Sequence, residues 1–190
     1  HVAATIDDAA RLAGELAAAG SVGVVLPDSD DPPWQRAGTA PLWLDALNGF
    51  AWLRDLRDNG DPQGALLAAK LVDDWTNREW RWSPVTWKRD VLAARMVAWI
   101  RHYEWMAASA DSGFPARFVF SLGRQRVHLR RAARRGMVGH EAVAVYKALV
   151  FADLAFIRDG KYFEKSLDQS LARLSKFLKR YVLHDGIVSE

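Results

Sequence analysis

The feature that most constrains the fold is a helical spacing of apolar residues that runs from residue 41 almost to the end of the chain. Apolar side chains recur every three to four positions, which is the repeat of an α-helix. Short glycine- or proline-containing segments interrupt the pattern: "DNGDP", "WSP", "DSGFP", "RGMVG" and "RDGK". The pattern therefore predicts helices over residues 42–58, 62–79, 88–109, 115–135, 140–158 and 161–183.

The first forty residues are expected to form an N-terminal extension, residues 1–40, ahead of a helical domain over residues 41–190. Residues 6–19 are predicted to be helical, with Asp7 and Asp8 in the first turn, where the helix dipole favours negative charge. The run "SVGVVLP" is short, apolar and strand-like, and a loop rich in proline, aspartate and glycine follows it.

The short connections between the predicted helices favour antiparallel hairpins. The segment "LWLDALNGFAWLRDLR" is apolar around most of its circumference, so other helices must cover it on more than one side. The predicted fold is all-α, with antiparallel helical hairpins arranged as a layered bundle or a helical toroid.

Composition excludes several kinds of protein and site. The chain has 190 residues, half of them hydrophobic, which fits one globular domain. It has no cysteine, so disulfides, thiolate zinc sites and cysteine nucleophiles are excluded. No apolar run is long enough to span a membrane, and no signal peptide is visible. No metal or cofactor is predicted.

Charge is unevenly distributed along the chain. Residues 1–79 hold 6 Lys and Arg against 13 Asp and Glu, whereas residues 80–190 hold 20 against 10. Much of the basic excess lies on the predicted helix 115–135, in two rows of arginines: Arg126, Arg130 and Arg134 on one side, and Arg124, Arg131 and Arg135 on the other. Such rows fit either a solvated helix surface or contact with an anionic polymer. Nucleic acid is not the predicted partner, because no nucleic-acid recognition motif is present.

Four segments resemble, in order and spacing, the helical domain of heparinase II/III-like polysaccharide lyases: "LWLDALNGFAWLRDL", "WKRDVLAARMVAWI", "HEAVAVYKALVFADLAF" and "LHDGIVSE". The resemblance covers roughly residues 40–190. It implies an incomplete α/α toroid that packs against a C-terminal β-sandwich domain, with an anionic, uronate-containing polysaccharide in the cleft between them. It also implies a β-eliminating lyase, a periplasmic location in a bacterium, and a chain that is a piece of a larger protein. In relatives, a catalytic tyrosine and a histidine of the β-sandwich complete the site beyond the segment that matches "DGIVSE".

The resemblance also nominates site residues. Family positions that contact substrate fall on Asn48, Trp52, Trp87 and Arg95, and the loop tryptophan Trp82 lies beside them. The carboxylate-neutralising asparagine of the family falls on His140, which makes His140 the candidate catalytic residue. Asn48 and His140 both replace the usual family residues. On a continuous helix 42–58, Asn48, Trp52 and Asp55 would share one polar face, as a cleft wall or as a helix–helix contact.

The remaining tryptophans divide by position. Trp75 and Trp99 lie on apolar stripes and are predicted to be core. Trp80, Trp82 and Trp87 lie in or beside a loop, where helical burial does not account for them. The alternative to a lyase is a non-catalytic helical domain that binds carbohydrate or a protein partner and has lost the active site.

Overall fold

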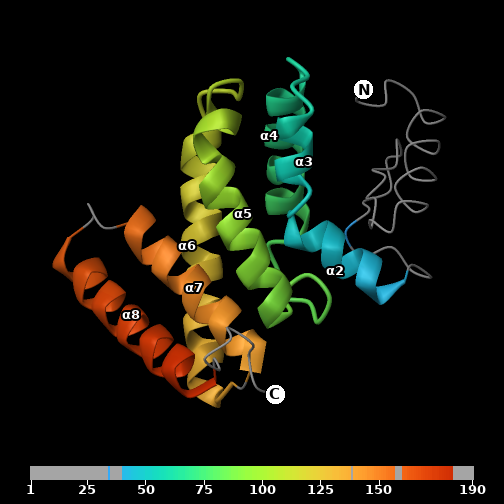
Figure 1. Ribbon diagram of the computed structural model, residues 1–190. Helices are drawn as coiled ribbons and strands as arrows, with labels where there is room; N and C mark the ends of the chain where they lie inside the picture. The colour runs from blue at the N-terminus through green and yellow to red at the C-terminus, as the bar shows by residue number, and fades with distance from the viewer. Residues whose placement is uncertain (1–33, 35–39, 138, 157–159, 182–190) are drawn as a thin grey trace.

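The computed structural model describes residues 34, 40–137, 139–156 and 160–181, and every regular element among them is helical (Figure 1). The α-helices are α2 (Pro41–Gly49), α3 (Leu53–Asp58), α4 (Gly64–Arg78), α5 (Arg89–Ala107), α6 (Phe114–Ala132), α7 (Gly139–Ala155) and α8 (Lys161–Tyr181), and the 3-10 helix η2 spans Ala133–Arg135. The all-α prediction is confirmed. The helix predicted over residues 6–19 and the strand-like run after it lie outside the described residues.

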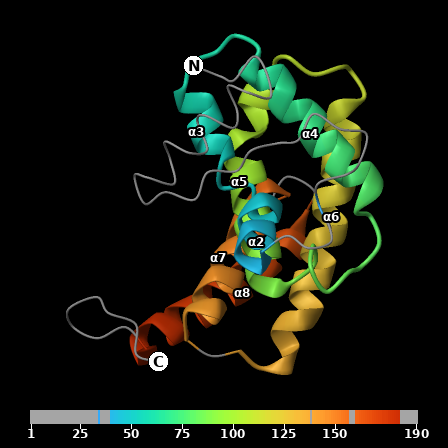
Figure 2. The ribbon, with the colours of Figure 1, turned by 90° about the vertical axis from the view of Figure 1, so that its right-hand side faces the viewer.

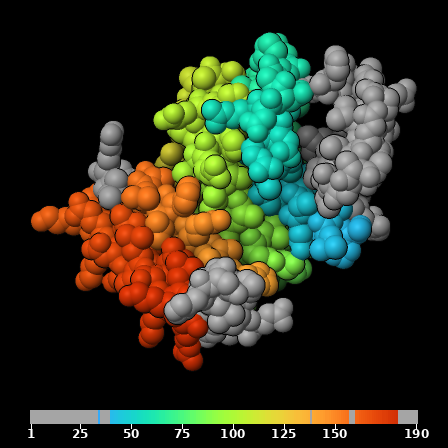
Figure 3. Space-filling view, in the orientation of Figure 1, coloured from blue at the N-terminus to red at the C-terminus, as the bar shows by residue number. Residues whose placement is uncertain are grey.

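Successive helices from α3 to α8 alternate in direction, so the chain folds as a series of antiparallel hairpins (Figure 1). Helix α5 is central: α2, α4, α6 and α7 all pack against it, and α8 packs on α7 (Figures 1 and 2). In the space-filling view, α8 covers one flank of α7 and presents its other side as molecular surface (Figure 3). None of these helices is both long and apolar enough to cross a membrane.

Aromatic side chains fill the core around α5. Trp75 and Trp99 are completely buried, which confirms both as core residues. The Trp99 ring meets the rings of Trp75 and Phe50 edge-on, at centroid distances of 5.5 Å and 5.4 Å. Edge-to-face contact between aromatic rings is favourable beyond the apolar area it buries. The core is thus fixed by ring geometry as well as by apolar burial.

The single helix predicted over residues 42–58 is wrong, because the chain breaks between α2 and α3. Phe50 adopts a left-handed backbone conformation with φ of 56°, and its N–H donates to the carbonyl of Leu47. This conformation costs a non-glycine residue roughly 1–2 kcal/mol. The Phe50 ring is fully buried between Trp34, Trp52 and Trp99, and this burial offsets the backbone cost.

Helix α8 is held differently from the others. Among the described residues of α8 the most buried side chains are Ser166 and Ser170, whereas Leu171 and Leu178 are exposed. Polar contacts therefore carry much of its attachment to α6 and α7.

Candidate functional site

An open groove of about 670 Å³ runs beside α6, between the loop over residues 79–88 and the start of α8. Aromatic residues from three separate parts of the chain form its walls. They are Trp80, Trp82 and Trp87 from the loop, Phe120 from α6, and Phe156, Tyr162 and Phe163 from the α7–α8 junction.

The loop is built on a buried polar turn. The hydroxyls of Ser83 and Thr86 lie 2.8 Å apart, and the Thr86 hydroxyl donates to the Glu79 carboxylate at 3.1 Å. The indole N–H of Trp87 donates to the Glu79 carbonyl at 2.8 Å. Because these bonds fix the second half of the loop, the first half, with Trp80 and Trp82, projects outward.

The groove presents large aromatic rings to solvent. Trp82 is 64% exposed, Phe120 70% and Tyr162 65%. Val119 and Val127 on the same side of α6 are exposed as well. Isolated exposed apolar residues are ordinary, but a contiguous apolar patch marks a binding surface. The groove is the best candidate for such a surface in the described part of the chain.

The charges that line the groove are positive. Arg124, Arg126 and Arg131 line it, and no acidic side chain among the described residues does. Arg124 donates to the Trp80 carbonyl, and its guanidinium lies 5.5 Å from the Trp80 ring. Arg131 makes no hydrogen bond or ion pair with any described residue. The groove therefore suits a ligand that combines negative charge with flat apolar faces.

His128 lies at the base of this groove, with its ring edge-on to Trp87 at 5.1 Å. Burial lowers the pKa of His128 below its ordinary value of 6.5, and Arg135, Arg131 and Arg95 lower it further. The imidazole is consequently neutral at pH 7 and can donate or accept a hydrogen bond.

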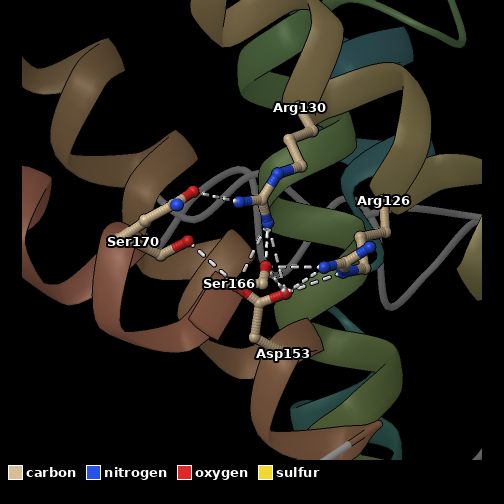
Figure 4. Close-up of polar contacts among 6 residues, drawn as sticks. Arg126, Arg130, Asp153, Ser166 and Ser170 are labelled. Atoms are coloured by element: carbon tan, nitrogen blue, oxygen red, sulfur yellow. Dashed lines mark hydrogen bonds and ion pairs between the residues drawn. The ribbon is translucent and has the colours of Figure 1, made fainter. Parts of the chain in front are cut away.

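Two arginines of the first row, Arg126 and Arg130, form a largely buried ion-pair network and not a solvated surface (Figure 4). Asp153 on α7 is completely buried and accepts bonds from Arg126 and Arg130. Ser166 and Ser170 of α8 donate to the same carboxylate at 2.7 Å and 2.9 Å. Because a buried charge must be compensated, this network ties α6, α7 and α8 together.

Two of the predicted substrate-binding residues line the groove. Trp82 is the more exposed of the two, whereas Trp87 is only 6% exposed although it lines the groove. The polar turn, not a helical stripe, buries Trp87 by folding it back onto Trp75, with the two ring centroids 6.1 Å apart.

Asn48 and Arg95 are fully buried beneath the loop. The Asn48 side-chain amide donates to the carbonyls of Trp34 and Leu44 and accepts from the Trp75 indole, each at 2.9 Å. Arg95 donates to the Asn48 and Thr86 carbonyls and to Gln125, while burial lowers its pKa well below the ordinary value. In this conformation Arg95 supports the loop from below, Asn48 anchors Arg95, and neither residue has surface that a ligand could touch.

Trp52 and His140 lie apart from this network. Trp52 is half-buried, and its indole donates to the Leu47 carbonyl at 3.0 Å. The predicted polar face of Asn48, Trp52 and Asp55 does not form, because the break at Phe50 ends the helix that would have aligned them. His140 is exposed in the first turn of α7 and has no hydrogen bond or ring contact with the other predicted residues.

Sequence reasoning missed Phe120 and Tyr162 as site residues. Both lie off the apolar stripe of their own helix, and this is the signal that could have found them. Among the described residues, no cluster of three or more histidine or acidic side chains could hold a metal ion.

Comparison with known proteins gives one informative similarity. FtsZ-localized protein C of Caulobacter vibrioides (strain NA1000 / CB15N) is 32% identical over 157 residues, which cover 83% of this chain. The matched region is 26% of that relative, so the chain spans about a quarter of the relative's length. No protein-family model matches the chain. No solved structure matches it either.

Proposed function

We propose that this chain is the toroid-type helical domain of a heparinase II/III-like protein, and that its groove binds an anionic, uronate-containing polysaccharide. The observation that supports this most is the combination of exposed rings at Trp82, Phe120 and Tyr162 with arginines and with no acidic lining residue in the described part of the chain. Sugar rings have apolar faces that aromatic side chains cover well, and uronate carboxylates need cationic or hydrogen-bonding partners.

In this proposal the groove is one wall of a cleft in which a parent protein carries out β-elimination. In that reaction a base removes the C5 proton of the uronate, the C4–C5 double bond forms, and the C4–oxygen bond breaks as an acid protonates the leaving oxygen. The groove holds polymer beside the reacting sugar, and the C-terminal β-sandwich domain of the parent is the second wall. Arg95 acts from beneath by donating to the Thr86 carbonyl of the loop that carries Trp82, and the Asn48 carbonyl holds Arg95 in place.

Isothermal titration of the chain with a uronate polymer tests the proposal. Trp82→Ala is expected to weaken binding about tenfold or more, because a central tryptophan commonly dominates the binding free energy. The matched control is Leu42→Ala, which removes an exposed apolar side chain outside the groove and should leave affinity unchanged. Equal affinities for the wild type and Trp82→Ala would reject this function for the groove.

A second function, binding of a protein partner, is favoured by the similarity to FtsZ-localized protein C. If this chain shares the property in that name, the protein that contains it is recruited to FtsZ. Cosedimentation of the full-length parent with FtsZ polymers tests this, with a parent lacking residues 41–181 as the comparison. Loss of cosedimentation on that deletion would support a partner-binding role for the helical domain, and unchanged cosedimentation would reject it.

A further inference from the structure

The spacing of charge along the groove indicates which class of polysaccharide it binds. This inference rests on the proposed function of the groove. Three arginines line it, but Arg126 is already neutralised by the buried carboxylate of Asp153 (Figure 4). The groove therefore offers two cations to a ligand: Arg124, which uses one donor on the Trp80 carbonyl, and Arg131, which has no partner among the described residues.

Arg124 and Arg131 lie seven residues apart on α6, so the same side of the helix carries both. At about 1.5 Å per residue, the two positions are separated by about 10 Å along the helix axis. This separation is close to the length of one disaccharide.

The surface between the two cations is apolar. Val127 lies between them along α6 and is exposed, and Gly123 comes just before Arg124. The Trp87 ring and the neutral His128 ring lie beside this stretch. A sugar bound between the arginines therefore meets apolar and neutral groups, and a second carboxylate there would lose water without gaining a cation.

We propose that the groove selects polymers in which an acidic sugar alternates with a neutral one, over polymers that carry a negative charge on every sugar. One carboxylate pairs with Arg124 and the next with Arg131, while the neutral sugar between them lies over Val127. Trp82 and Phe120 extend the apolar contact at the Arg124 end of the groove.

The test compares four probes at a salt concentration of about 0.15 M. Hyaluronan alternates uronate with a neutral sugar, polygalacturonate is acidic at every sugar, heparin is highly sulfated, and polyglutamate carries charge without rings. Hyaluronan should bind most tightly per unit length. When the logarithm of its binding constant is plotted against the logarithm of the salt concentration, the slope should be less than about two in magnitude, because two ion pairs form.

Variants assign the contacts. Arg124→Ala and Arg131→Ala should each weaken hyaluronan binding about fivefold and reduce the salt slope, as expected for loss of one partly exposed ion pair. Arg134→Ala is the matched control, because Arg134 is an exposed arginine in η2, just after α6 and outside the groove, and it should change neither quantity.

The outcomes separate this inference from the function on which it rests. Tighter binding of heparin or polygalacturonate, together with a Trp82→Ala defect, would overturn the charge-spacing inference and leave the polysaccharide groove standing. Polyglutamate binding as tightly as hyaluronan would overturn it as well, since the groove would then recognise charge alone. Failure of all three polysaccharides to bind would reject the proposed function and the inference with it.

Discussion

Replacing Asp153 with alanine should destabilise the chain more than any exposed charge substitution. Asp153 is completely buried, and Arg126, whose side chain is only 5% exposed, donates to it at 2.7 Å through Nε. The change leaves the Arg126 guanidinium buried without a counter-charge and removes the acceptor of Ser166 and Ser170. Breaking one side of a buried ion pair costs about 3–5 kcal/mol. Since domains are stable by about 5–15 kcal/mol, this loss is a large fraction of the total.

Urea denaturation followed by circular dichroism measures the loss, and hydrogen exchange locates it. Amides of α8 should lose protection first, because the most buried side chains of this helix both donate to Asp153. Asp55→Ala is the control: its ion pair with Arg54 is at least 70% exposed on both sides and should contribute less than about 0.5 kcal/mol.

A double variant tests the cause of the loss. Asp153→Leu combined with Arg126→Met removes both charges and should recover much of the stability, because a well-packed apolar pair often replaces a buried ion pair without loss. If Asp153→Ala cost less than about 1 kcal/mol, or if the double variant were no more stable than the Asp153→Leu single variant, the buried ion pair would not be what holds α8.

Three further predictions concern the loop support and the histidines. Asn48→Ala should cost about 2–3 kcal/mol in urea denaturation, because the Trp75 indole loses its acceptor in the core; weaker polysaccharide binding without lost stability would instead make Asn48 a ligand contact. The free energy of unfolding should fall as pH drops below about 6.5, because burial lowers the folded-state pKa of His102 and His128 and the unfolded chain then binds protons first. A urea midpoint that is constant or higher at about pH 5.5 than at about pH 7.5 would contradict this, and His128→Gln should flatten the profile. Polysaccharide affinity should rise only at lower pH, where His128 of the folded chain itself becomes charged, and His128→Gln should abolish that rise in a titration across the pH range.

The spacing of apolar residues in the sequence predicted most of the helices, because helix formation depends on residues that are close together in the chain. Helix α5 spans Arg89–Ala107 where residues 88–109 were predicted, and the burial of Trp75 and Trp99 followed from their apolar stripes. The break at Phe50 could not be predicted in the same way. A left-handed phenylalanine is stable here only because rings from distant segments surround it, and no local signal reports their presence.

The site depended on contacts between segments far apart in the sequence. Arg126 finds its carboxylate 27 positions later on another helix, and Arg95 bonds to a carbonyl 47 positions earlier. Helical periodicity assigns a side to each residue but does not identify its partner. For this reason the sequence could nominate Trp82 as a loop tryptophan, yet it could not distinguish a ligand-binding arginine from one that supports the loop.

The most direct test of the central claim is an NMR titration of the indole N–H signals with a uronate oligosaccharide. Trp82, which lies exposed in the groove, should show the largest shift, whereas the completely buried Trp99 should not move. A shift of the Trp82 indole signal that saturates with a single dissociation constant would support the groove as the saccharide-binding site. Binding that leaves the Trp80, Trp82 and Trp87 signals unchanged would contradict it.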